Sequence, residues 1–138
     1  MTPLLLDTHA VVWLMEGNPR LRPQVRVQID LAAKEGLVYV SAISFWEVAV
    51  LVSKKRLVLG REVQLWSEDV LAMPGFRLLP LIPSIAIDST RLPWEMHSDP
   101  ADRILAASAR YLGATLITAD HLLLRYATEG GLRCLQAE

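Results

Sequence analysis

Short apolar runs alternate along the chain with longer segments in which apolar residues recur at helical spacing. The short runs predict strands at 3–6, 37–40, 76–79, 115–118 and 132–135. The longer segments predict helices at 8–16, 22–34, 44–55, 61–72, 83–91, 100–112 and 120–126. Strands that alternate with helices indicate a mostly parallel five-stranded sheet covered on both faces, which is a three-layer α/β/α sandwich.

Glycine and proline residues mark several ends of these elements. Gly36 ends the second predicted helix, the pair Pro74-Gly75 breaks the fourth, and Gly113 stops the helix before the fourth strand. The chain shows no internal repeat, low-complexity tract or linker, and 138 residues is an ordinary size for one domain. We therefore expect residues 1–138 to form a single domain.

Net charge, cysteine content and apolar run length limit where the protein can act and what it can bind. The formal net charge of −1 gives no general attraction to a polyanion, so nucleic-acid affinity would depend on local clusters of Lys and Arg. The only cysteine, Cys134, cannot form an internal disulfide, which suits a reducing compartment. The N-terminus does not look like a signal peptide, and no uncharged apolar run is long enough to cross a bilayer. We expect a cytoplasmic protein that does not bind membranes.

The apolar content predicts a protein partner. Hydrophobic residues make up 52% of the chain, and the mean hydropathy is +0.30. A domain this small cannot hide all of these side chains inside, so part of the apolar surface is expected to meet another chain. We expect either a homo-oligomer or a complex with a second protein.

Four acidic residues stand alone in apolar stretches, at predicted strand ends and helix starts. Asp7 ends the first strand, Glu47 lies in the first turn of an apolar helix, Asp102 lies at the start of the helix at 100–112, and Asp120 follows the fourth strand. In open parallel sheets the ligand site lies beyond the carboxyl ends of the strands, where the strand order reverses. We therefore predict that these four acids meet in one cleft.

Helix capping is the alternative explanation for each acid. Asp7 and Asp120 can cap the helices that follow them, Asp99 can cap the helix that contains Asp102, and Ser44-x-x-Glu47 matches a capping box. Taken singly, each acid is about as compatible with a cap as with a ligand, but four acids at one edge of a sheet are harder to explain as separate caps. The alternative to an enzyme is a non-catalytic α/β module that binds a partner through its apolar surface.

Clustered carboxylates predict a metal-dependent reaction. Carboxylates held close together repel one another, so at neutral pH the cluster must take up protons or bind a cation. Ligands that are all oxygen favour Mg²⁺ or Mn²⁺ over zinc. One or two such ions can activate water and neutralise charge on a phosphoryl oxygen, so the predicted chemistry is phosphodiester hydrolysis.

The histidines have weaker indications of function. His9, His97 and His121 have neither the paired helical spacing nor the cysteine partners of a zinc site. A structural or exposed position is the favoured interpretation for all three. His97, beside the acidic loop, is the best candidate for a functional role.

Aromatic and basic residues could contact RNA but have simpler explanations. Tryptophan at helical spacing is more typical of a core or interface than of base stacking, and this applies to Trp13, Trp46, Trp66 and Trp94. Basic clusters are usually solvated faces, yet two of them could hold an RNA backbone: residues 54–56 with Arg61, and Arg20, Arg22 and Arg26. Arg103 is expected to make a salt bridge or to contact a phosphate.

Other α/β families fit poorly. A receiver domain needs an acid after its third strand and a lysine after its fifth, whereas this chain has Leu79-Pro80 and no late lysine. An aspartyl-phosphate phosphatase needs an acid two residues after Asp7, where this chain has His9. No glycine-rich phosphate-binding sequence follows the first strand, which argues against P-loop and dinucleotide-binding folds.

Three blocks in fixed order carry a family resemblance: LLLDTHAVVWLMEG, SAISFWEVAVLVSKKRL and DPADRILAASARYLGATLITAD. In these blocks the chain resembles PIN-domain proteins, most closely the VapC-like toxins of type II toxin–antitoxin pairs. The blocks cover most of the chain, and the match is weaker between Leu57 and Trp94. In that weaker region we expect preferences for substrate and antitoxin to vary.

The resemblance implies a Mg²⁺- or Mn²⁺-dependent endoribonuclease with a parallel five-stranded α/β/α fold. It also implies a homodimer that a cognate antitoxin holds inactive. The four acids of the family fall on Asp7, Glu47, Asp102 and Asp120. Thr118 matches the hydroxyl residue that helps to hold the site, and Asp99 matches an auxiliary acid. The resemblance leaves open whether Asp99 or Asp102 contacts the metal directly.

Overall fold

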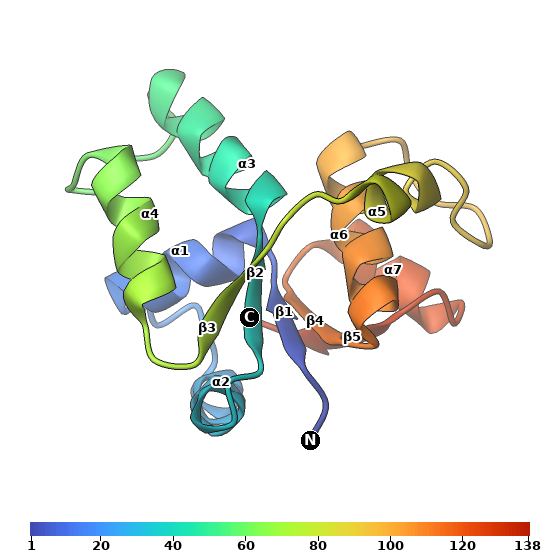
Figure 1. The fold of residues 1–138 in the computed structure, drawn as a ribbon, viewed down its shortest axis with the longest axis horizontal. Helices are drawn as coiled ribbons and strands as arrows, with labels where there is room; N and C mark the ends of the chain where they lie inside the picture. Colours follow the sequence, from blue (N-terminus) through green and yellow to red (C-terminus); the bar gives the residue numbers. More distant parts are fainter.

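Five strands form one sheet at the centre of the computed structural model, which describes all 138 residues (Figure 1). The strands are β1 (Leu4–Leu6), β2 (Val38–Ser41), β3 (Phe76–Leu79), β4 (Thr115–Thr118) and β5 (Arg133–Gln136). The helices are α1 (Thr8–Glu16), α2 (Pro23–Lys34), α3 (Ala42–Ser53), α4 (Val63–Ala72), α5 (Pro83–Asp88), α6 (Pro100–Leu112) and α7 (His121–Thr128). Every neighbouring pair of strands is parallel, so the predicted α/β fold is confirmed.

Two hydrophobic cores cover the two faces of this sheet. Leu4 and Leu6 of β1 point into a core shared with α1 to α4, and Leu5 points into a second core shared with α5 to α7. The two groups of helices lie on opposite sides of the sheet in Figure 1. Because both faces are buried, β1 is apolar throughout, without the alternation of a half-exposed strand.

The strand order reverses beside β1. In the order β3-β2-β1-β4-β5, the chain first moves outward from β1 to β3 and then returns to the other side of β1. Leu6 of β1 pairs with Ile117 of β4, and the Asp7 amide donates to the Ile117 carbonyl at 3.0 Å. The carboxyl ends of β1 and β4 therefore lie side by side, with Asp7 and Thr118 at the edge where a ligand site is expected.

The predicted start of α3 at Ser44 is wrong, and the capping box that was the alternative explanation for Glu47 does not form. The helix begins at Ala42, and the side chain of Ser41 accepts a hydrogen bond from the Ile43 amide. Ser44 is consequently buried inside the helix, and Glu47 lies in its second turn. The physical reason is that β2 continues as far as Ser41, whose hydroxyl is then placed at the helix start before Ser44 is reached.

Other element ends differ from the predictions by a few residues. The fourth helix begins at Val63 with Glu62 as its cap, α5 ends at Asp88, and α7 extends to Thr128. None of the helices combines the length and the apolar composition that crossing a bilayer requires.

Cys134 on β5 is partly buried beside the second core. Burial, followed by the negative charge of Asp7, raises the pKa of its thiol to about 12. Since the thiolate is the reactive form, we expect Cys134 to react with DTNB much more slowly in the native protein than in the denatured protein at mildly alkaline pH. Spectrophotometric rates with and without guanidinium measure this, and equal rates would show an accessible, ionised thiol.

Candidate metal centre

Asp7 and Asp120 are joined through the hydroxyl of Thr118. Asp7 is buried, with its side chain in position to cap α1 through a 2.9 Å hydrogen bond from the Ala10 amide to Oδ1. Thr118 Oγ1 donates to Asp7 Oδ2 at 2.5 Å and accepts from the Asp120 amide at 3.0 Å. Asp120 in turn caps α7, because its Oδ1 accepts from the amides of Leu122 and Leu123. One oxygen of Asp120 is left outside these cap hydrogen bonds.

Glu47 reaches the same edge from α3. Its Oε1 atom accepts a hydrogen bond from Thr8 Oγ1 at 2.5 Å, across 39 residues of sequence. Thr8 is the first residue of α1, and its hydroxyl oxygen also lies 3.1 Å from Ser44 Oγ. Thr8 therefore links Glu47 to the end of β1, one residue after Asp7.

Asp102 and Asp99 play different roles at the start of α6. Asp99 is exposed and caps the helix, since its Oδ1 accepts from the Asp102 amide at 3.2 Å. Asp102 is half-buried, and its Oδ2 lies 2.6 Å from Nε2 of His97. His97, Asp102 and Asp120 can each offer one ligand atom such that all three atoms lie within 4.8 Å of one another. Of Asp99 and Asp102, only Asp102 belongs to this group of possible metal ligands.

The clustering of these acids is visible in their electrostatics. Burial raises the pKa of the Asp7 carboxyl, and the charge of Asp120 raises it further, against hydrogen bonds from Thr118 and Ala10 that lower it. Burial is also the main reason for the raised pKa of Glu47, with smaller contributions from the charges of Asp102 and Asp99. The net shift of both pKa values is upward, so the surroundings of Asp7 and Glu47 favour the neutral carboxylic acid when no cation is bound.

Asp102 connects the two halves of the cluster electrostatically. Burial raises the pKa of Asp102, a hydrogen bond from His97 acts in the opposite direction, and the charges of Asp120 and Asp99 raise it again. No Lys or Arg side chain forms an ion pair with Asp7, Glu47, Asp102 or Asp120. Histidine is the only basic side chain paired with the cluster, through the contact between His97 and Asp102, and it carries a charge only when protonated.

Arg103 forms no salt bridge, one of its two expected roles, and the other, a contact to a phosphate, stays a prediction. Its guanidinium donates to three backbone carbonyls, those of Ser89, Met96 and His97, at 2.8, 3.1 and 3.3 Å. The Tyr126 hydroxyl donates to the Pro93 carbonyl in the same loop. Through these hydrogen bonds, the guanidinium holds the loop that contains His97 against the start of α6.

Sequence reasoning missed two of the partners in this cluster. Thr8 was treated only as the start of a helix, and Ser44 only as a cap, yet both lie beside Glu47. A signal was present in the order of the residues, since Thr8 directly follows Asp7 in an otherwise apolar segment. Which residue on α3 would meet Thr8 could not be known without the packing of α1 against α3.

The aromatic and basic residues divide between structural and exposed positions. Trp13 and Trp66 are buried as expected for core residues, whereas Trp46 and Trp94 are 59% and 58% exposed. Arg20 stacks over the Trp13 ring and pairs with Glu138. Arg22 and Arg26 donate to the carbonyls of Gln136 and Asn18. These three arginines have structural partners, while residues 54–56 at the end of α3 are exposed.

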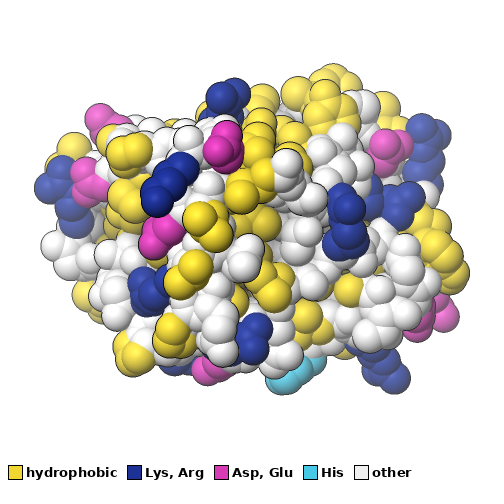
Figure 2. Space-filling view, turned by 90° about the horizontal axis from the view of Figure 1, so that it is seen from below, with side chains coloured by type: hydrophobic (Ala, Val, Ile, Leu, Met, Phe, Trp, Pro, Cys, Tyr) yellow, Lys and Arg dark blue, Asp and Glu magenta, His cyan; other side chains and the backbone are white.

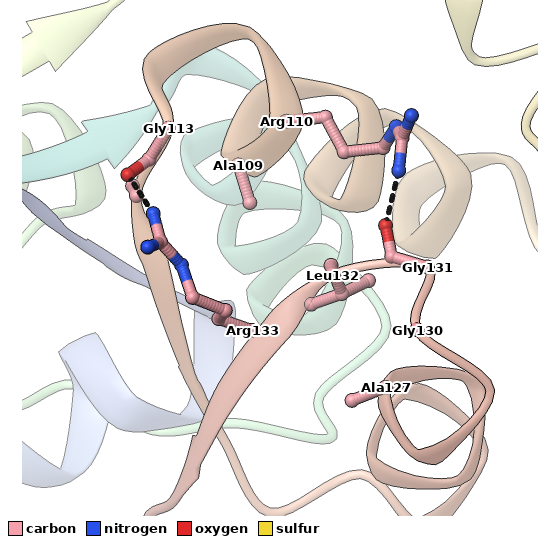
Figure 3. A pocket seen from close by; sticks show the side chains of 9 residues that line it. Ala109, Arg110, Gly113, Ala127, Gly130, Gly131, Leu132 and Arg133 are labelled. Atoms are coloured by element: carbon pink, nitrogen blue, oxygen red, sulfur yellow. Dashed lines mark hydrogen bonds between the residues drawn. The ribbon is translucent and has the colours of Figure 1, made fainter.

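A separate hollow lies at the amino ends of β4 and β5, opposite the acidic edge (Figure 3). Two arginines reach across its rim toward backbone carbonyls. Arg110 donates to Gly131, and Arg133 donates to Gly113. Arg110 therefore joins α6 to the loop between α7 and β5, and Arg133 joins β5 to the end of α6. The hollow contains no acidic or nucleophilic side chain.

The donor set fits a hard divalent cation. Four carboxylates without a Lys or Arg partner supply oxygen ligands, and each of Asp7, Glu47 and Asp120 is oriented by a hydroxyl or by backbone amides. Ligand atoms around an octahedral Mg²⁺ lie about 3 to 4 Å apart, which the spacing of Asp102 and Asp120 allows. The fold and this edge define a class of protein: a parallel α/β domain with a carboxylate cluster where the strand order reverses.

The family that shares these features is identified by comparison. The model of the PIN domain matches residues 4–129, and the chain belongs to the PIN-domain family. Ribonuclease VapC22 of Mycobacterium tuberculosis (strain ATCC 25618 / H37Rv) is 32% identical over 123 residues, which cover 89% of this chain and 91% of that protein. The predicted resemblance to VapC-like proteins is confirmed.

Two solved structures show the same fold. VapBC2 from Rickettsia felis, bound to a DNA fragment from its promoter, has a TM-score of 0.72 at 18% identity, and 98% of each chain is covered. DNA-bound VapBC from Salmonella typhimurium has a TM-score of 0.70 at 16% identity, again with 98% of each chain covered. The assignment of Asp7, Glu47, Asp102 and Asp120 as metal ligands stays a prediction.

Proposed function

We propose that residues 1–138 act as one PIN domain that hydrolyses RNA phosphodiester bonds with Mg²⁺ or Mn²⁺ as its cofactor. The observation that supports this proposal is that Asp102 and Asp120 offer ligand atoms within 4.8 Å of each other, while the charge of Asp120 acts on Asp7 and that of Asp102 acts on Glu47. None of these four acids is paired with a Lys or Arg. A divalent cation relieves the repulsion among such groups. The 32% identity to Ribonuclease VapC22 supports RNA as the substrate.

The chain's own residues would orient the carboxylates for this role. Thr118 and the Ala10 amide hold the two oxygens of Asp7, and Thr8 holds one oxygen of Glu47. When bound, a divalent cation supplies Lewis acidity that activates water and offsets phosphoryl charge. Burial of Asp7 keeps competing water away from this part of the site. We propose Asp102 as the direct ligand from α6 and Asp99 as its auxiliary.

Helix capping does not account for the whole cluster. Asp7, Asp99 and Asp120 do cap α1, α6 and α7, an observation that favours the alternative of a non-catalytic interaction module. Glu47 and Asp102, however, accept no cap hydrogen bond, and their partners are Thr8 and His97. Two half-buried carboxylates directed at the same edge without a capping role favour the nuclease.

We also propose that the protein is a cytoplasmic toxin, that it forms a homodimer, and that a cognate antitoxin holds it inactive. The structural similarity to VapBC proteins supports a second protein as partner. Exposed apolar side chains supply candidate contact surface, among them Trp46 on α3, Val58 after that helix and Leu65 on α4. On the face in Figure 2, apolar patches lie among interspersed acidic and basic side chains.

Chelation tests the proposed chemistry. The purified protein should cleave a fluorescently labelled RNA in the presence of Mg²⁺ or Mn²⁺, lose this activity in excess EDTA, and regain it when either ion is restored. Gel electrophoresis of the RNA over time provides the measurement. A preparation that cleaves equally fast in EDTA would contradict the proposal.

A further inference from the structure

His97 contacts Asp102, one of the four acids, through a ring nitrogen. Its Nε2 lies 2.6 Å from Asp102 Oδ2, and the side chains of His97 and Asp102 are only 19% and 17% exposed. His97 belongs to the loop between α5 and α6, whereas Asp102 belongs to the first turn of α6. The contact therefore joins two elements that could otherwise move independently at the edge of the cluster.

The backbone at His97 is held by the residue next to Asp102. Arg103 donates to the carbonyls of both Met96 and His97, and its Nε also donates to the Ser89 carbonyl. The Tyr126 hydroxyl from α7 fixes the same loop at Pro93. A planar guanidinium that makes several hydrogen bonds holds its partners in a defined geometry. Adjacent residues of α6 thus contribute the carboxylate and the anchor for the histidine that contacts it.

We propose that His97 is a positioning residue, which holds the Asp102 carboxylate in the orientation that divalent-cation binding requires. This inference rests on the proposed metal-dependent function. An aspartate near a helix start has several rotamers, and a fixed hydrogen-bond donor selects one of them. With Nε2–H donating to Oδ2, the second oxygen of Asp102 is left free of this hydrogen bond, in a carboxylate that offers a ligand atom within 4.8 Å of one from Asp120. The ring nitrogen at the contact then has no lone pair to offer to a metal.

Two variants separate the donor from the ring. His97→Phe keeps an aromatic ring but removes the donor, whereas His97→Gln removes the ring but can place an amide N–H close to the position of Nε2. Mn²⁺ affinity, measured for the full chain by isothermal titration calorimetry and by the electron paramagnetic resonance signal of free Mn²⁺, is the readout. We expect His97→Phe to weaken Mn²⁺ binding about tenfold or more and His97→Gln to remain close to wild type.

The outcomes distinguish a positioning role from the other possibilities. Unchanged Mn²⁺ affinity in His97→Phe would overturn the proposal, and so would an equal loss in both variants, because the imidazole itself would then be needed. Thermal unfolding without metal shows whether each variant folds. RNA cleavage by the wild type is followed in parallel: Mn²⁺ binding without cleavage would reject the nuclease but leave the result for His97 standing, and absence of Mn²⁺ binding in the wild type would overturn both.

Discussion

Asp7→Asn is expected to reduce metal-dependent RNA cleavage by about 100-fold or more while the protein stays folded. Asparagine retains an oxygen that can accept the hydrogen bond from the Ala10 amide, so the cap of α1 is preserved. The substitution removes the negative charge of the most buried acid in the cluster. Single-turnover cleavage rates in Mn²⁺, together with the thermal unfolding midpoint, measure the two effects separately.

A matched substitution far from the site controls for the change in charge. Asp30 is exposed on α2, and Asp30→Asn should cleave RNA at the wild-type rate. If Asp7→Asn is poorly folded, Asp120→Asn provides the same test at a second helix cap, where asparagine again retains the cap acceptor. An Asp7→Asn protein with normal activity would show that Asp7 is only a cap.

Without metal, the acidic cluster is expected to lower the free energy of unfolding at neutral pH. Lowering the pH or adding a divalent cation should restore this stability. The folded-state pKa values of Asp7, Glu47 and Asp102 are raised, above all by burial. The folded protein therefore binds protons at these groups more tightly than the unfolded chain does. Their contribution to stability is complete below the ordinary carboxyl pKa values of 3.8 and 4.5, and it is lost as the pH rises through the raised values.

Denaturant unfolding followed by tryptophan fluorescence, in EDTA and in Mn²⁺, tests this linkage. At neutral pH, Mn²⁺ at a hundredfold excess over its Kd should add about 2.7 kcal/mol to the free energy of unfolding. The variant Glu47→Gln lacks one group with a raised pKa, so in EDTA it should lose less stability than wild type between acidic and neutral pH. If the free energy of unfolding varied with pH in the same way for both proteins, and Mn²⁺ did not increase it, the results would be incompatible with a metal-binding cluster.

The positions of strands and helices could be predicted because they depend on local properties of the chain. The apolar run of β1 and the helical periodicity of α6 are visible without any knowledge of neighbours. The isolated acids at strand ends were also visible, and the preference of parallel sheets for ligands at that edge brought them together in the prediction. The sequence supported both a capping role and a metal-ligand role for these acids. In the structure, the side chains of Asp7 and Asp120 each cap a helix and also lie in the acidic cluster.

The errors concern contacts that depend on the packing of distant segments. The sequence predicted a helix starting at Ser44, with a capping box of Ser44 and Glu47 as the alternative to a functional role, whereas Ser41 is the cap and Glu47 accepts a hydrogen bond from Thr8. Arg103 was expected to make a salt bridge or to contact a phosphate; it makes no salt bridge and donates to backbone carbonyls of a loop.

By itself, the sequence determined the α/β elements, the acids at their ends and the family, because periodicity, propensity and residue spacing are properties of short stretches. The tertiary structure decided which side chains hold those acids. The contacts from Thr118 to Asp7 and from Thr8 to Glu47 span 111 and 39 residues. Such pairs form only once the strand order of the sheet is fixed and both of its faces are buried. The strand order depends on the packing of the whole chain, so it cannot be read from short stretches of sequence.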